Sequence, residues 1–183
     1  GSHCGDVLIL TKPLGVGLTL NALRMDDCSK EMQEKVFKSM TTLNKYACDI
    51  LKKYDVHALT DVTGFGLLVH LNEMLDETNS AIIYKDSIPY FDDCRKYVEE
   101  FYLSGAAQTN RNSVEGKIRF DCDFFTEEIL FDPQTSGGLL ASVSKDDLAD
   151  IQKDFKENNL ELYVVGEVIE KNEYNVYVRG RKI

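Results

Sequence analysis

The chain has 183 residues, of which 43% are hydrophobic, so it suits one domain with a core of its own. Its net charge of −10 argues against a nucleic-acid partner and against an anionic membrane surface, because both need a basic protein face. Its five cysteines are widely spaced and include no CxxC pair, which argues against a zinc site or a disulfide framework and favours a cytoplasmic protein.

The ends and the hydropathy of the chain set its expected domain organisation. Gly1-Ser2-His3 is typical of an expression-tag remnant, so we expect the domain to span residues 4–183. No apolar run approaches the roughly 18 residues of a membrane helix, and no signal-peptide pattern is present. We therefore expect a domain that neither spans nor binds a membrane.

The first half of the chain predicts strands and helices in turn. Runs rich in Val, Ile and Leu indicate buried strands, and apolar residues three and four apart indicate helices. Ser29 is the predicted N-cap of the longest helix. In chain order we expect a strand, a short helix, a long helix, a strand, a helix and a strand at residues 6–11, 19–24, 30–54, 57–62, 64–74 and 80–84.

The second half predicts a helix at 90–102 and a small, polar loop at 104–117. A strand at 139–143 and a helix at 145–158 follow, and strands at 161–169 and 174–179 end the chain. This mixture of helices and strands indicates a layered α/β or α+β domain.

Residues 58–68 (ALTDVTGFGLL) place Asp61 at the end of a predicted strand, just before a glycine turn and a helix. Backbone N–H groups and the helix dipole favour an anion at such a turn, and a carboxylate can hold Mg²⁺ beside a phosphate. Asp61 is thus a candidate metal ligand, and Thr63, Gly64 and Gly66 are candidate phosphate contacts. In the simpler interpretation, Asp61 is a helix N-cap and the glycines serve a turn that needs positive φ.

A second segment of similar character covers residues 131–140 (FDPQTSGGLL). Asp132, Thr135 and Ser136 are candidate nucleotide contacts there, and the two glycines allow close approach of a ligand or of another backbone. Asp132 could instead brace the turn.

Three polar residues outside these segments are weaker candidates. Thr109 and Asn112 lie in the predicted loop, which could face a cleft or could simply be solvated. Lys12 could contact phosphate from its turn, although an exposed lysine is the more ordinary interpretation.

An ordered set of segments now points to a family: GDVLILTKPLG at 5–15, residues 58–68 and 131–140 as above, VGEV at 165–168, and a weaker MTTLN at 40–44. The set resembles the C-terminal half of selenophosphate synthetase (selenide, water dikinase), a relative of aminoimidazole ribonucleotide synthetase. The resemblance implies an α+β fold with a mixed β-sheet layered by helices. It also implies Mg²⁺ and ATP, with Asp61 helping to hold the metal–nucleotide assembly.

The family reaction converts selenide, ATP and water into selenophosphate, AMP and phosphate. The resemblance implies that an N-terminal domain, outside this sequence, forms a homodimer and most of the ATP site. The reactive Cys or selenocysteine and its lysine belong to that domain, so we expect no catalytic residue here and no turnover by this chain alone. Two alternatives stay open: a sister enzyme of the aminoimidazole ribonucleotide synthetase or thiamine phosphate kinase type, and a non-catalytic binding or assembly module.

Overall fold

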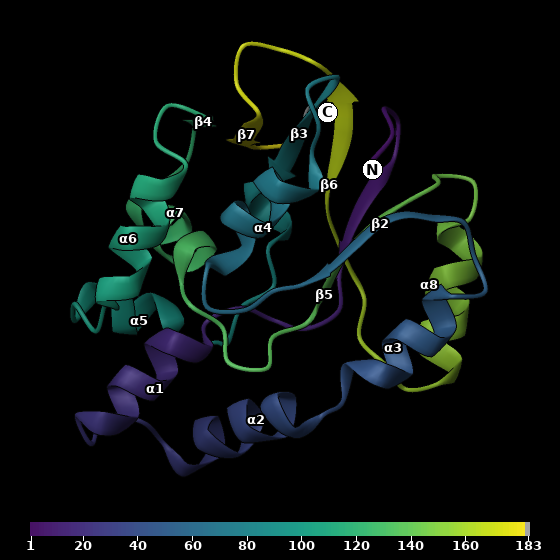
Figure 1. Cartoon of the computed structure of the whole chain (residues 1–183). Helices are drawn as coiled ribbons and strands as arrows, with labels where there is room; N and C mark the ends of the chain where they lie inside the picture. Colours follow the sequence, from purple (N-terminus) through teal and green to yellow (C-terminus); the bar gives the residue numbers. More distant parts are fainter. Residues whose placement is uncertain (182–183) are drawn as a thin grey trace.

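A seven-stranded mixed sheet organises residues 1–181, the part of the chain that the computed structural model describes (Figure 1). The strands lie in the order β2-β5-β1-β6-β3-β7-β4. β1 runs antiparallel to both of its neighbours, β5 and β6, whereas β7 runs parallel to β3 and β4. The expected α+β fold with a mixed sheet is therefore confirmed. The strands are β1 (Val7–Leu10), β2 (Val56–Asp61), β3 (Asn79–Tyr84), β4 (Ile118–Phe120), β5 (Leu139–Val143), β6 (Tyr163–Glu170) and β7 (Val176–Arg179).

Helices cover both faces of this sheet, and a separate hydrophobic core lies on each face of β1. Leu8 and Leu10 of β1 pack in the larger core, while Val7 and Ile9 pack in the smaller one, as the alternation of strand side chains requires. Figure 1 shows α3 and α8 together on one side and α4 to α7 on the other. The helices are α1 (Val16–Arg24), α2 (Lys30–Thr41), α3 (Asn44–Leu51), α4 (Gly66–Met74), α5 (Cys94–Glu99), α6 (Gly105–Ser113), α7 (Phe124–Phe131) and α8 (Leu148–Glu157), with a short 3₁₀ turn η1 (Lys85–Ser87).

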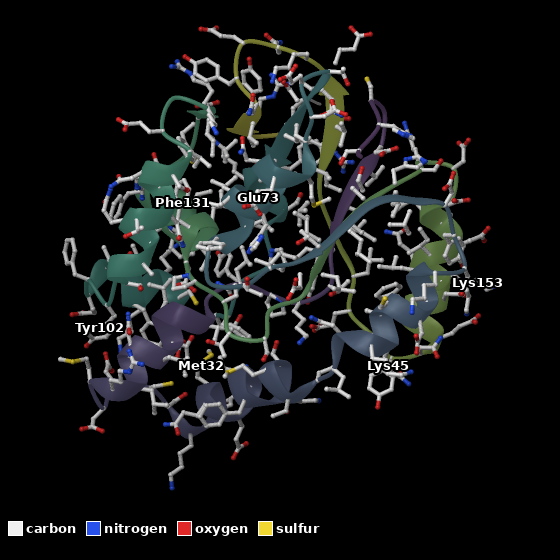
Figure 2. The ribbon with its side chains drawn as sticks, viewed as in Figure 1. Met32, Lys45, Glu73, Tyr102, Phe131 and Lys153 are labelled. Carbon is white, nitrogen blue, oxygen red and sulfur yellow. The ribbon has the colours of Figure 1, made fainter. Side chains whose placement is uncertain are left out.

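The outer faces of α3 and α8 carry charged side chains. Lys45 of α3 and Lys153 of α8 point away from the sheet into solvent (Figure 2). Within residues 1–181, no helix has both the length and the apolar character needed to cross a bilayer.

The long helix predicted at 30–54 is wrong, because the chain forms two helices there. Thr42 and Leu43 are extended, with ψ near 119° and 132°, and they separate α2 from α3. The Thr42 hydroxyl donates back to the Lys38 carbonyl at 2.8 Å, a local bond that competes with helix continuation. The side chain of Lys12 also bonds the Thr42 carbonyl, at 2.7 Å, so long-range contacts hold the break open.

The loop predicted at 104–117 is also wrong, because residues 105–113 form α6. Ser104 caps this helix by accepting a hydrogen bond from the Ala106 N–H at 3.2 Å. The residues of this helix are small or polar, and only Ala107 and Asn110 among them are buried, so its sequence carries almost no apolar periodicity. β4 and α7 follow where no element was predicted.

Candidate functional site

The two sequence segments that suggested phosphate chemistry and the turn that holds Lys12 converge at one edge of the sheet. β1 and β2 both run antiparallel to β5, so their C-terminal ends flank its beginning. Asp61 pairs with Leu139, and Leu10 pairs with Leu140 on the other side of β5. The loop after β1, the loop after β2 and the loop before β5 therefore meet, and we call this place the Asp61 edge.

Backbone packing holds these loops together tightly. The Val62 N–H donates to the Gly138 carbonyl at 2.8 Å, and the Thr11 N–H donates to the Leu139 carbonyl at 3.1 Å. A Cβ atom on Gly137 would lie 2.1 Å from the Val62 carbonyl oxygen, so only glycine fits there. Gly137 therefore allows close approach of the backbone at Val62, rather than of a ligand.

Asp61 is exposed at this edge and is free of protein partners. Its carboxylate forms no hydrogen bond or ion pair within residues 1–181, while its backbone is held in the ladder with β5. Phe65, rather than Asp61, is the N-cap residue of α4, and no side-chain bond caps that helix. The N-cap interpretation of Asp61 is therefore wrong, and its carboxylate is available to a cation.

The three candidate phosphate contacts in the turn after Asp61 differ in accessibility: Gly64 is exposed, whereas Thr63 and Gly66 use polar groups within the protein. Gly66 has φ of +75° and its N–H donates to the Thr63 carbonyl at 3.0 Å, so a turn with positive φ is confirmed there. The Thr63 hydroxyl lies 3.1 Å from Nε2 of the buried His70. Gly64 is exposed, and a Cβ there would meet nothing within 4 Å. Gly64 is thus the position of the turn that a ligand can approach.

Asp132 is buried and braces the loops. Its Oδ2 accepts hydrogen bonds from the Gly17 N–H and from Gln134 Nε2, both at 2.9 Å, so it holds the first turn of α1. Its Oδ1 is buried without a partner. Burial raises the pKa of Asp132 to about 7. These contacts favour the bracing role, while the neighbouring Thr135 and Ser136 are exposed.

Thr109 and Asn112 lie on the exposed side of α6. The Thr109 hydroxyl donates within the helix to the Gly105 carbonyl at 3.4 Å, and Asn112 Oδ1 accepts a bond from Gln108 at 2.9 Å. Asn110, next to Thr109 on the buried side of the helix, is the residue that reaches the Asp61 edge.

Asn110 is a structural residue that sequence reasoning missed. It is buried, and its Nδ2 donates to the carbonyls of Gly64, at 2.9 Å, and Phe131, at 3.1 Å. Its signal was the spacing of Ala107, Asn110 and Val114, which places all three on one buried face of a helix. Because Asn110, the middle residue of the three, is polar, the set does not stand out as an apolar helix face.

Lys12 is likewise buried, so the interpretation as an ordinary exposed lysine is wrong. Its Nζ donates to the carbonyls of Thr42, at 2.7 Å, and Ser136, at 2.9 Å. Asn44 Nδ2 donates to the Gly137 carbonyl at 2.8 Å. The weak 40–44 segment therefore packs directly against the loop before β5.

One group of possible metal ligands lies at the opposite end of β1 and β2. His3, Asp6 and His57 bring their ligand atoms within 4.8 Å of one another. Asp6 already accepts hydrogen bonds from His57 Nδ1, at 2.8 Å, and from the Ser142 hydroxyl, at 2.6 Å. The bond to Asp6 raises the pKa of His57. We interpret this group as a structural hydrogen-bond cluster.

Comparison with known sequences gives a consistent result. A family profile described as "AIR synthase related protein, C-terminal domain" matches residues 4–179. The selenide, water dikinase of Agathobacter rectalis is 45% identical over 175 residues, a match that covers 94% of this chain and 51% of the relative. The chain spans about half the length of the curated relatives it matches.

Solved structures share the fold at low identity. A thiamine-monophosphate kinase from Stenotrophomonas maltophilia matches with a TM-score of 0.66 and 16% identity, covering 100% of this chain and 52% of that one. The hydrogenase maturation protein HypE in complex with ATP matches with a TM-score of 0.65 and 16% identity, covering 94% and 44%. At these identities the likeness concerns the fold alone.

Proposed function

Because the chain belongs to the AIR synthase related family and forms its C-terminal domain, we propose that it is one half of a selenide, water dikinase. The whole protein would make selenophosphate, AMP and phosphate from selenide, ATP and water. Its other half, an N-terminal domain, would carry the reactive Cys or selenocysteine and form the homodimer. The five cysteines form no disulfide with one another, an arrangement that fits a cytoplasmic enzyme.

The observation that carries this proposal is the free carboxylate of Asp61 among three converging loops. Mg²⁺ prefers oxygen ligands and is commonly bound by one or two carboxylates together with substrate phosphates. An exposed carboxylate without a protein partner fits that requirement. When bound, Mg²⁺ would offset the charge of the transferred phosphate groups.

The remaining candidate residues divide by exposure. Gly64, Thr135 and Ser136 are exposed, so their N–H and hydroxyl groups can donate to the nucleotide phosphates. Thr109 and Asn112, on the helix that bonds Gly64, are the outermost candidates for contact with ATP.

Three other candidates would act mainly by shaping the Asp61 edge. Thr63 and Gly66 use their polar groups within the turn, and Asp132 uses one carboxylate oxygen on α1. We propose that these residues hold the exposed donors in place and keep the Asp61 carboxylate facing the nucleotide. No step of bond making is assigned to this chain.

Phosphorus NMR of the full-length parent protein, with ATP, Mg²⁺ and selenide under anaerobic conditions, tests this function. We expect a selenophosphate signal together with AMP and phosphate, all dependent on selenide. ATP turnover with another acceptor and none with selenide would identify a sister enzyme. Nucleotide binding without turnover in a folded full-length protein would indicate a non-catalytic module.

A further inference from the structure

A cavity of about 610 Å³ lies beside the turn after β1, between α2, α3 and the segment that leads into β6. Its size is in the range of small-molecule sites. Three lysines, Lys12, Lys35 and Lys38, contribute to its wall, and we call it the lysine cavity. Asp61 is not among its lining residues, so the lysine cavity is distinct from the metal site proposed above.

Lys12 supplies a buried positive charge to this wall. The residue is 7% exposed, and its amine forms no ion pair within residues 1–181. An ammonium group has three donors, and the carbonyls of Thr42 and Ser136 take two of them. Buried charges are normally paired with an opposite charge, so two neutral carbonyls leave the Lys12 ammonium incompletely compensated.

Lys38 adds a second cation that has no carboxylate partner in the described chain. Lys35 differs, because Glu31 and Asp92 lie 3.0 and 3.3 Å from its Nζ. Glu161 is the remaining carboxylate of the wall. In a chain of net charge −10, a cavity with two uncompensated lysines favours an anionic ligand.

The rest of the wall suits an uncharged, ring-bearing portion of a ligand. Tyr90 and Tyr163 line it with aromatic surface. Asn44 also lines the wall, and its Nδ2 donates to the Gly137 carbonyl at 2.8 Å.

We propose that the lysine cavity binds a small organic phosphate. Its phosphate group lies against Lys12 and Lys38, and its ring portion lies on Tyr90 and Tyr163. This site does not depend on the reaction proposed above, because it uses none of the exposed groups of the Asp61 edge.

The test is an NMR titration of the ¹⁵N-labelled chain with AMP as the probe, in phosphate-free buffer containing EDTA. We expect saturable shifts of the amides near Lys12, of residues 38–44 and of residues 90–92. AMP should bind more tightly than either inorganic phosphate or adenosine. Equal binding of adenosine would overturn the phosphate assignment, and equal binding of inorganic phosphate would overturn the assignment of an organic ligand.

Variants at exposed positions avoid the risk of unfolding that a change at the buried Lys12 carries. Lys38→Gln should weaken AMP binding about tenfold to 100-fold, the loss expected for one hydrogen bond to a charged group. Lys117→Gln, a matched change at an exposed lysine outside the cavity, should leave binding unchanged. Asp61→Asn should also leave it unchanged. Shifts confined to residues 61–66 and 135–136 would overturn the proposal.

Discussion

The side chain of Asn110 donates one hydrogen bond to the carbonyl of Gly64, 2.9 Å away, and so ties α6 to the turn that follows Asp61. A second bond from the same amide nitrogen, to the Phe131 carbonyl at 3.1 Å, ties that turn to the end of α7. Asn110 therefore joins two segments that are far apart in the sequence and that both form the Asp61 edge. The position of the turn depends on a residue that contacts no proposed ligand.

Replacing Asn110 with alanine should destabilise the fold. The change leaves two backbone carbonyls without their donor, and we expect a loss of about 1–3 kcal/mol in the free energy of unfolding. Urea denaturation of the chain measures this loss. Asn112→Ala, an exposed change on the same helix, should stay within about 0.5 kcal/mol of the unmodified chain. Equal effects of the two changes would show that the bonds of Asn110 contribute nothing.

Asp61→Asn should separate activity from stability. The carboxylate has no protein partner within residues 1–181, so the melting temperature of the chain should hardly change. In the full-length parent protein, we expect formation of AMP to fall by about 100-fold or more, since even indirect supports of metal sites cost 10–100-fold. Asp146→Asn, at an exposed aspartate far along the chain, is the matched control. Retained activity in Asp61→Asn would exclude the metal role.

Local sequence signals predicted the parts of the fold that local interactions decide. The Val, Ile and Leu runs correctly predicted β1 and β5, and the apolar periodicity correctly predicted helix from residue 30 onward, because burial of one face determines these patterns. The break between α2 and α3 was not predictable in this way. Besides the local Thr42 bond, the break involves Lys12, which is 30 residues away from Thr42 in the chain.

The candidate site shows the same division. The sequence placed Asp61 correctly at a strand end, because a strand followed by a glycine turn is a local pattern. It could not separate the buried Asp132 from the exposed Thr135, since burial of a loop residue is decided by the segments that pack on it. It also could not find Asn110, whose partners lie in two other loops.

The glycines of the Asp61 edge should differ sharply in their tolerance of a side chain. In Gly137→Ala the new Cβ would lie 2.1 Å from the Val62 carbonyl oxygen, so backbone must move, at a cost of about 1–3 kcal/mol or more. In Gly64→Ala the Cβ meets nothing within 4 Å, and stability should change by no more than about 0.5 kcal/mol. Thermal unfolding of the two variants decides between them. A larger loss in Gly64→Ala would contradict the packing described for this edge.

The buried carboxyl group of Asp132 should make stability depend on pH. Its pKa is raised to about 7 by burial, whereas an unfolded aspartate titrates near 3.8. Between these two pKa values the folded state holds a proton on Asp132 that the unfolded state has lost. The contribution of Asp132 to stability is therefore greatest below about pH 4 and decreases as the pH rises towards 7. The slope contributed by Asp132 should be at most about 1.4 kcal/mol per pH unit.

Comparison with Asp132→Asn isolates this contribution from that of other groups. His57 also has a raised pKa, and its contribution is lost as pH rises above 6.5 through that raised value. Asp6, whose pKa is lowered by hydrogen bonds that outweigh its burial, loses its contribution only as pH falls below 3.8. Urea unfolding between pH 4.5 and about pH 6.5 therefore avoids most of the pH dependence that His57 and Asp6 contribute. We expect the free energy of unfolding to fall with pH in the unmodified chain and to fall less steeply in Asp132→Asn. Identical slopes would mean that Asp132 ionises in the folded protein as an ordinary aspartate does.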